Sequence, residues 1–213
     1  MPYCTLCGSA QAYLTDEVVD DVDLEGTGSY ELRTTGLLSR SNKVMYEFHT
    51  GSVFDTFTGE AVSGPLHDAG VMLEPITVVT ARWGDWKQAH PDTTIVAQDG
   101  GIGRDYPDDP LRGRDDGGPI FPIGDVDPRL PVQEEVGVVA PDGTAVAFPA
   151  DAARETLASG EEVRLGDVRV RASAGGLTAE LGDGRPVTSH QAFWFAWSRF
   201  HPETRLWTPV LNN

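Results

Sequence analysis

The residues of this chain that are best suited to chemistry are two cysteines near its start. They stand in the sequence Cys4-Thr5-Leu6-Cys7-Gly8, and the chain contains no other cysteine. A turn of this type can bring both sulfurs together, because the glycine that follows lets the backbone bend around them. The spacing therefore allows three uses for Cys4 and Cys7: part of a metal site, a redox pair, or a structural pair.

A metal site would need ligands from elsewhere in the chain. A closed zinc site takes four ligands, and no pair of histidines has the spacing that zinc sites use, so zinc is weakly supported. Copper(I) is satisfied by two thiolates with or without a third ligand, and copper is the better prediction. We expect Cys4 and Cys7 as soft ligands, with His49 or His90 as a third.

A redox use of the cysteine pair has less support. Efficient dithiol enzymes place the first cysteine at the start of a helix, where the dipole lowers the pKa of the thiol. Here the residues after Gly8 predict a turn followed by a strand. The usual motifs of hydrolases, nucleotide-binding proteins, zinc proteases and dehydrogenases are absent from the sequence. Whether the chain is an enzyme is left open, beside small-ligand binding and a purely structural role.

The charge of the chain restricts its partners. Its 33 acidic residues outnumber its 16 basic ones, which gives a net charge of −17. Such a surface repels phosphate backbones and anionic lipids, so we exclude nucleic acid and expect a small ligand or another protein as partner. Only Lys43 and Lys87 are lysines, whereas 14 residues are arginine and 20 are aspartate. This bias predicts adaptation to concentrated salt, where acidic side chains repel each other less. The sequence does not predict the oligomeric state.

The sequence also bears on location. No stretch of about 18 consecutive apolar residues is present, so no transmembrane segment is predicted. The first residues lack the basic and apolar regions of an export signal. We expect a soluble, cytoplasmic protein, or an extracytoplasmic one if further residues precede Met1.

An internal repeat indicates how the chain is organised. Residues 75–96 align without gaps on residues 186–207, and eight of the 22 positions are identical, including two tryptophans. In each copy the two tryptophans and a histidine have the spacing of one helical face, and a proline ends the helix. We therefore predict two related lobes, each with a helix whose tryptophans pack against the sheet of the same lobe.

Short strands are predicted elsewhere in the chain, because brief apolar or alternating runs are bounded by Gly, Asp or Pro. The expected fold class is α+β, mainly antiparallel β with a few short helices. We place the first lobe, with the cysteine turn, at residues 1–98 and a connector rich in Gly, Pro and Asp at 99–133. A second, degenerate lobe is expected at 134–213.

Several segments together resemble a known protein family. They are YCTLCGSAQAY at 3–13, GLLSRSNKVMYEFHTGSVFDTFTGEAVSGPL at 36–66, RDY at 104–106, and two W-x-x-W-x-x-x-H-P-x-T patterns. This combination resembles the proteins called domain of unknown function 3179 over nearly the whole chain. The resemblance implies a two-lobed protein without an assigned activity, in a family whose members often carry an export or lipoprotein signal. Its members commonly have Thr at the position of Cys7, and they begin further upstream, which implies an uncovered sheet edge near residues 9–14 unless another segment lies there.

The predicted salt adaptation has a direct test. Transfer from molar salt to low salt should lower the thermal midpoint and loosen the fold, because acidic side chains then repel one another over longer distances. Circular dichroism melting at several salt concentrations measures the midpoint. An unchanged midpoint at low salt would refute the prediction.

Overall fold

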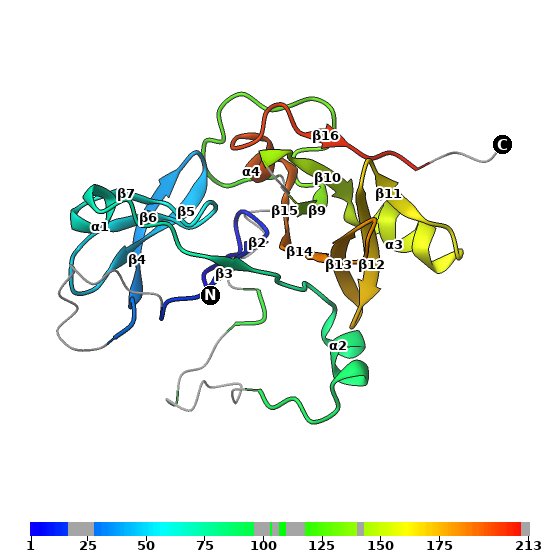
Figure 1. The fold of residues 1–213 in the computed structure, drawn as a ribbon, viewed down its shortest axis with the longest axis horizontal. Coiled ribbons are helices and arrows are strands. Elements are labelled where there is room, and N and C mark those ends of the chain that lie inside the picture. Colours follow the sequence, from blue (N-terminus) through cyan, green and yellow to red (C-terminus); the bar gives the residue numbers. More distant parts are fainter. Residues whose placement is uncertain (17–27, 96–102, 104–106, 110–117, 140–142, 210–213) are drawn as a thin grey trace.

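The structure is a computed structural model of the chain, and it describes residues 1–213 apart from 17–27, 96–102, 104–106, 110–117, 140–142 and 210–213. The described part contains short strands and four short helices, arranged as shown in Figure 1. The helices are α1 (Pro65–Asp68), α2 (Trp83–Ala89), α3 (Ala150–Ala158) and α4 (Trp194–Ser198). The strands before residue 100 are β1 (Tyr3–Cys4), β2 (Ser9–Ala10), β3 (Ala12–Tyr13), β4 (Leu32–Ser39), β5 (Asn42–Glu47), β6 (Val53–Asp55), β7 (Ala61–Ser63) and β8 (Pro75–Ile76). The later strands are β9 (Glu135–Val139), β10 (Val146–Pro149), β11 (Val163–Leu165), β12 (Val168–Ser173), β13 (Gly176–Leu181), β14 (Pro186–Val187), β15 (Ser189–Phe193) and β16 (Arg205–Leu206).

Strand pairing confirms the predicted α+β class. Within the described residues, β10 and β16 pair in parallel and every other strand pair is antiparallel. The strands are short because turns interrupt them. Two-residue turns in the left-handed region close the β4–β5 hairpin at Arg40-Ser41 and the β12–β13 hairpin at Ala174-Gly175. The segment at 71–74 contributes only a bridge between Glu60 and Met72.

The C-terminal part is built from two four-stranded sheets with a helix beside them. Their orders are β15-β9-β10-β16 and β11-β12-β13-β14. Apolar side chains of β10, β12 and β13 form one buried cluster, to which α3 adds Ala150 and Ala153. Helix α3 follows directly on β10, with Pro149 preceding its first residue. Asp151 lies in the first turn of α3 and does not cap it.

The N-terminal part has a separate sheet of order β4-β5-β6-β7 and its own buried cluster around Phe54 and Leu66. Glu47, at the end of β5, is fully buried, and its carboxylate accepts hydrogen bonds from the amides of Glu31, His49 and Thr50. Burial alone would raise the pKa of Glu47, but these bonds outweigh it and lower the pKa below its ordinary value. The turn from β5 to β6 is thus held by an ionised internal carboxylate.

The two parts are joined where residues 7–8 meet the end of β15. The amide of Phe193 donates a 3.0 Å hydrogen bond to the carbonyl of Cys7, and Gly8 lies against the Phe193 ring. At the β4–β5 turn, the side-chain amide of Asn42 donates to the carbonyl of Ala196 at 3.1 Å. Residues 9–12 are buried as a result, so the sheet edge expected to be open there is covered by the chain itself.

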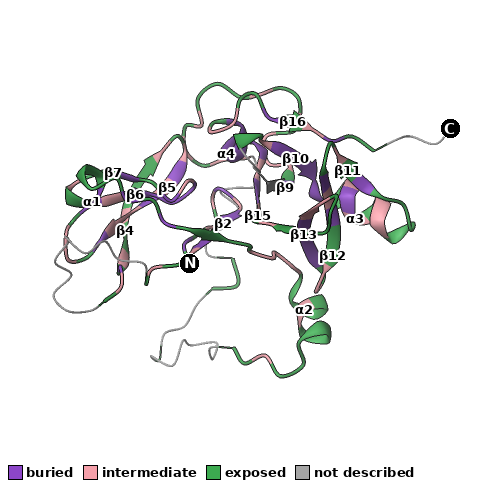
Figure 2. Ribbon diagram, in the orientation of Figure 1, coloured by how far each residue is buried: buried purple, intermediate pink, exposed green. Residues whose placement is uncertain are grey.

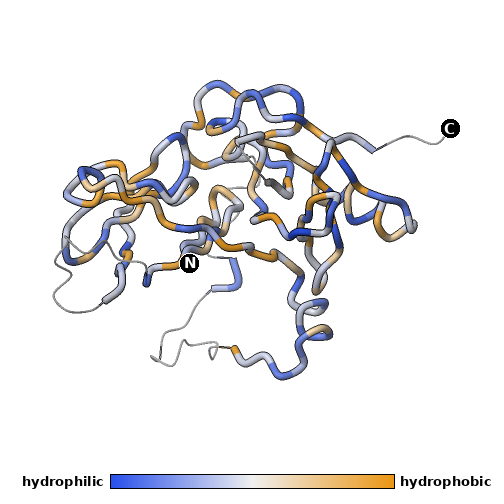
Figure 3. The backbone as a smooth tube through the Cα atoms, viewed as in Figure 1, coloured by the Kyte–Doolittle hydropathy of each residue, from blue (hydrophilic) through white to orange (hydrophobic). Residues whose placement is uncertain are grey.

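The hydrophobic extended segment at residues 75–80 reinforces this junction (Figure 3). It runs from β8, which pairs with β3, and then along β15, where the amide of Val78 donates to the carbonyl of Ser189 at 2.9 Å. Further along, it comes so close to the start of β13 that a side chain on Gly176 would overlap the carbonyl oxygen of Thr80. The segment after β8 therefore belongs spatially to both parts.

The two tryptophan helices have different surroundings. In α4 the side chains of Trp194 and Trp197 are buried, as predicted. In α2 no residue is buried and Trp83 is 50% exposed, so the predicted packing against a sheet is wrong for α2 (Figure 2). The residues between the two tryptophans are consistent with this difference, since they are Phe-Ala in α4 and Gly-Asp in α2.

The predicted connector contributes to the core around α4. Its described residues include Phe121, Ile123, Leu130 and Val132, which pack against the buried cluster of α4. The carbonyls of Val132 and Glu134 accept hydrogen bonds from the first amides of α4. Residues 118–133 are therefore part of the fold rather than a loose link, while the RDY segment lies outside the described residues.

The contact at Gly8 can be tested by substitution. Gly8 and Gly36 both have positive φ, 57° and 75°, so an alanine at either position costs about 1–2 kcal/mol. Of these two glycines, only Gly8 has atoms close to the position of an added Cβ, namely the ring carbons of Phe193 at 2.8 Å. Gly8→Ala should therefore lower the free energy of unfolding more than Gly36→Ala does, as measured by urea unfolding. Equal losses would contradict the docking described here.

Candidate functional site

The cysteine turn, residues 4–8, connects β1 to β2. Cys4 pairs with Ser9 across the two strands, and the amide of Cys7 donates to the carbonyl of Cys4 at 3.2 Å. The sulfurs of Cys4 and Cys7 form a disulfide, with the two Cα atoms 5.3 Å apart. Cys7 is fully buried and Cys4 is partly exposed. An outside thiol could therefore reach Cys4 more easily than Cys7.

The turn lies beside the start of β5. The sulfur of Cys7 is 3.3 Å from the carbonyl oxygen of Ser41, which precedes β5. On its other side the turn contacts Phe193. Both neighbours are neutral, and the turn is followed by a strand rather than a helix. The arrangement matches a structural disulfide that fixes the start of β2.

The structure does not bring the predicted metal ligands together. His49 follows the end of β5 that is distant from Ser41; since a strand rises about 3.3 Å per residue, roughly 20 Å of chain separates them. His90 follows α2, where its ring packs on Trp86 at 4.2 Å between centroids. Within the described residues no three His, Cys, Asp or Glu side chains form a group that could hold a metal ion. The ligand set of Cys4, Cys7, His49 and His90 stays a prediction.

A cavity of about 510 Å³ lies where the N-terminal strands meet β15 and α4. Its volume is in the range of small-molecule sites. We call it the aromatic cavity, because five of its lining residues carry aromatic rings. It is lined by Gln11, Ala12, Tyr13, Phe57, Thr58, Met72, Pro75, Ile76, Gly143, Thr188, His190, Trp197 and His201.

The rings of the cavity pack closely on one another. Phe57 lies 5.2 Å from His190 and 5.7 Å from Trp197, and Trp197 lies 4.0 Å from His201, all between centroids. The indole of Trp197 donates to Thr204, and the hydroxyl of Tyr13 donates to the carbonyl of Thr56, both at 3.1 Å. These bonds hold two large side chains in place. The wall is thus built before any ligand enters.

The part of the lining that the structure describes is electrically neutral. Among the described residues that line the cavity there is no Asp, Glu, Lys or Arg. Burial, together with the neighbouring His201, lowers the pKa of His190 to about 4, and burial lowers the pKa of His201 as well. Burial and then the charge of Asp55 raise the pKa of Tyr13. All three side chains are therefore uncharged at neutral pH.

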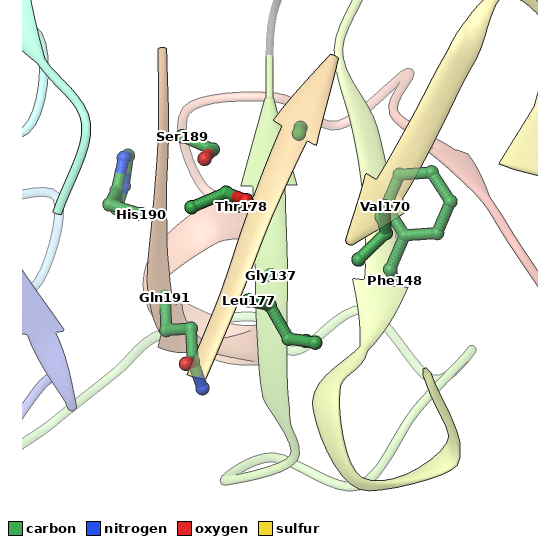
Figure 4. Close-up of a pocket in the computed structure, with 9 residues that line it drawn as sticks. Gly137, Phe148, Val170, Leu177, Thr178, Ser189, His190 and Gln191 are labelled. Atoms are coloured by element: carbon green, nitrogen blue, oxygen red, sulfur yellow. The ribbon is translucent and has the colours of Figure 1, made fainter. Parts of the chain in front are cut away.

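A second, much smaller space lies inside the C-terminal part. It measures about 10 Å³ and is lined by residues of both sheets, among them Phe148, Val170 and Leu177 (Figure 4). Such a volume barely accommodates one water molecule, so this space holds no ligand. Figure 4 also shows that His190 lies on the face of β15 opposite Ser189 and Gln191. Because side chains alternate along β15, His190 points away from the space between the two sheets and towards the aromatic cavity.

The sequence did not predict His190, Gln11 or Phe57 as site residues. Gln11 had a usable signal, since it is a large polar residue within the apolar strand run at 9–14. His190 had none, because its position on β15 becomes informative only when Gln11 and Phe57 are placed against it. The distance along the chain between these residues hides the cavity from a single sequence.

Fold and site together define an α+β protein with a disulfide turn and a neutral, ligand-sized cavity. The chain belongs to the family described as protein of unknown function (DUF3179), whose model matches residues 1–179, and this confirms the resemblance seen in the sequence. Neither a curated protein nor a solved structure matches the chain. Within its described residues, no helix is long and apolar enough to cross a membrane.

The neutral state of His190 has a consequence for stability. The pKa of His190 is about 4 in the folded protein against an ordinary 6.5, so between these values the unfolded chain binds a proton that the folded chain excludes. The free energy of unfolding should therefore fall as the pH drops from 6.5 to 4, by up to about 3 kcal/mol from this group. His190→Gln should flatten this slope in urea unfolding across the pH range. The control is His67→Gln, at an exposed side chain of α1. Equal slopes in all three proteins would contradict the assignment.

Proposed function

We propose that the chain binds a small, uncharged, largely apolar molecule in the aromatic cavity. The observation that carries the proposal is a cavity of about 510 Å³ whose lining combines aromatic rings with a few neutral polar groups. Ligand sites of proteins commonly have this composition, in which apolar walls supply affinity and a few polar atoms supply orientation. The cavity also lies between segments far apart in sequence, which is a frequent position for such sites.

Charge supports an uncharged ligand. An anion would find no positive partner among the described lining residues, and it would approach a protein of net charge −17. A cation would find no carboxylate there. Moving an unpaired charge out of water is costly, so the neutral wall selects against both.

The disulfide supports a structural role for the cysteine turn, which is to hold one wall of the cavity in place. It precedes β2 and β3, and Gln11, Ala12 and Tyr13 of that stretch line the cavity. The bond between Cys4 and Cys7 limits how the turn can move, and so steadies this wall. The partly exposed Cys4 favours thiol–disulfide exchange as the second candidate function, in which an outside thiolate bonds to the Cys4 sulfur and Cys7 leaves as a thiolate. Copper or zinc bound by Cys4, Cys7 and His49 or His90 would first require reduction of the disulfide.

We also propose that the two parts arose by duplication, with lobes at 1–98 and 134–213. The support is a repeated local contact. The indole of Trp86 donates to Thr93 at 3.1 Å, and the indole of Trp197 donates to Thr204 at 3.1 Å. In both helices the second tryptophan packs on the histidine that follows, at 4.2 Å in one and 4.0 Å in the other. The lobes would then have diverged, since only the second covers its helix.

Binding can be measured with N-phenyl-1-naphthylamine, a neutral aromatic probe whose fluorescence rises in apolar surroundings. The unmodified protein should bind it saturably. Ile76→Trp, which places a large ring on a partly exposed lining residue, should weaken probe binding by about tenfold or more, equivalent to about 1.4 kcal/mol.

The matched control is Ile95→Trp, the same change at an isoleucine that is 70% exposed and does not line the cavity. This variant should bind the probe as the unmodified protein does. Absence of saturable binding, or equal weakening by both changes, would overturn the proposed function.

A further inference from the structure

Two polar side chains of the aromatic cavity are incompletely satisfied. The amide nitrogen of Gln11 and the Nε2 atom of His190 are both buried and have no hydrogen-bond partner, and both residues contribute to the cavity wall. Gln11 as a whole is only 5% exposed. Buried polar atoms of folded proteins nearly always have a partner, so an unpaired donor of this kind calls for an explanation.

A second buried glutamine shows the contrast within the same protein. Gln191 is 3% exposed and lies on the other face of β15 from His190 (Figure 4). Its amide oxygen accepts a hydrogen bond from Arg154 at 3.1 Å, and its amide nitrogen donates to Glu135 at 3.4 Å. The fold therefore satisfies the glutamine that lies away from the cavity and leaves the one in the cavity wall with a free donor.

We propose that the ligand of the aromatic cavity is an uncharged aromatic carbonyl compound, whose carbonyl oxygen accepts a hydrogen bond from the amide of Gln11. This inference rests on the proposed function and names the ligand class. The flat ring system lies among Phe57, Trp197 and Tyr13, where offset and edge contacts between rings are favourable. The carbonyl oxygen supplies the acceptor that Gln11 lacks once the side chain of Gln11 turns its amide into the cavity, because the amide nitrogen is fully buried in the structure.

The imidazole of His190 narrows the expected class of ligands further. At neutral pH its imidazole is uncharged, because burial lowers its pKa to about 4. A neutral imidazole nitrogen that carries no hydrogen accepts a hydrogen bond. A ligand that bears an N–H beside its carbonyl, as a primary carboxamide does, can satisfy Gln11 and His190 together. We therefore expect aromatic carboxamides to bind at least as well as aromatic ketones.

The test uses compounds that share one ring system and differ in the polar group. Naphthalene, 2-acetylnaphthalene, 2-naphthamide and 2-naphthoate are each used to displace N-phenyl-1-naphthylamine from the unmodified protein at neutral pH. The ketone and the amide should bind about tenfold more tightly than naphthalene, as one hydrogen bond to a previously unpaired donor implies. The naphthoate anion should bind more weakly than either.

The outcomes separate the two proposals. Saturable probe binding with equal displacement by naphthalene and its carbonyl derivatives would overturn the ligand class and leave the proposed function standing. Preference for naphthoate would also overturn it. Failure of the probe itself to bind would remove the proposed function and this inference with it. The series on the unmodified protein decides the question whether or not any variant folds.

Two leucine variants identify the residue responsible. Gln11→Leu removes the unpaired donor, so it should keep or raise the thermal midpoint and abolish the preference for the carbonyl compounds over naphthalene. Gln191→Leu is the control, because it breaks the two hydrogen bonds that Gln191 makes with Arg154 and Glu135. It should lower the midpoint and keep the preference. A preference that survives Gln11→Leu would contradict the role given to Gln11.

Discussion

The contact between the cysteine turn and the end of β15 is the interaction on which the remaining structure depends. The amide of Phe193 donates to Cys7 just before α4 begins, and the absence of a side chain at Gly8 lets the turn lie on the Phe193 ring. Asn42 adds a second bond to the carbonyl of Ala196. Because both contacts involve backbone groups at fixed positions, they set the distance between the N-terminal strands and α4, and so the space that remains between them.

That space is the aromatic cavity, and its neutral, apolar lining follows from which parts of the chain form its walls. The N-terminal part provides Phe57 and the stretch at 11–13, while the C-terminal part provides His190 and Trp197. Neither set encloses a volume alone. Since each wall also belongs to a packed core, the described residues that face the cavity are apolar or neutral, and their titratable groups have pKa values shifted towards the uncharged form. The disulfide lies behind one wall and steadies it.

Comparison of α2 with α4 shows which features of a helix its sequence predicts and which it does not. Their shared spacing of two tryptophans and a histidine predicted both helices, because local backbone preference decides where a helix forms. The predicted end before the proline is correct for α2, whereas α4 already ends at Ser198 and does not include His201. Burial could not be read from the spacing. It depends on the segment at 118–134, whose carbonyls accept the first amides of α4, and the described residues hold no equivalent cover for α2. A pattern within one helix carries no information about a distant partner.

The sequence by itself determined the α+β class, several of the short strands, the family, and the closeness of Cys4 to Cys7, since each of these depends on neighbouring residues or on a motif within one segment. Tertiary structure alone decided which residues surround the disulfide and how far His49 and His90 lie from the cysteines. It also decided that Gln11 packs near the face of β15 that carries His190. The physical reason is range. Turns and strand alternation are set within a few residues, whereas a cavity exists only after segments more than a hundred residues apart have packed, and its chemistry belongs to the polar atoms that this packing leaves without partners.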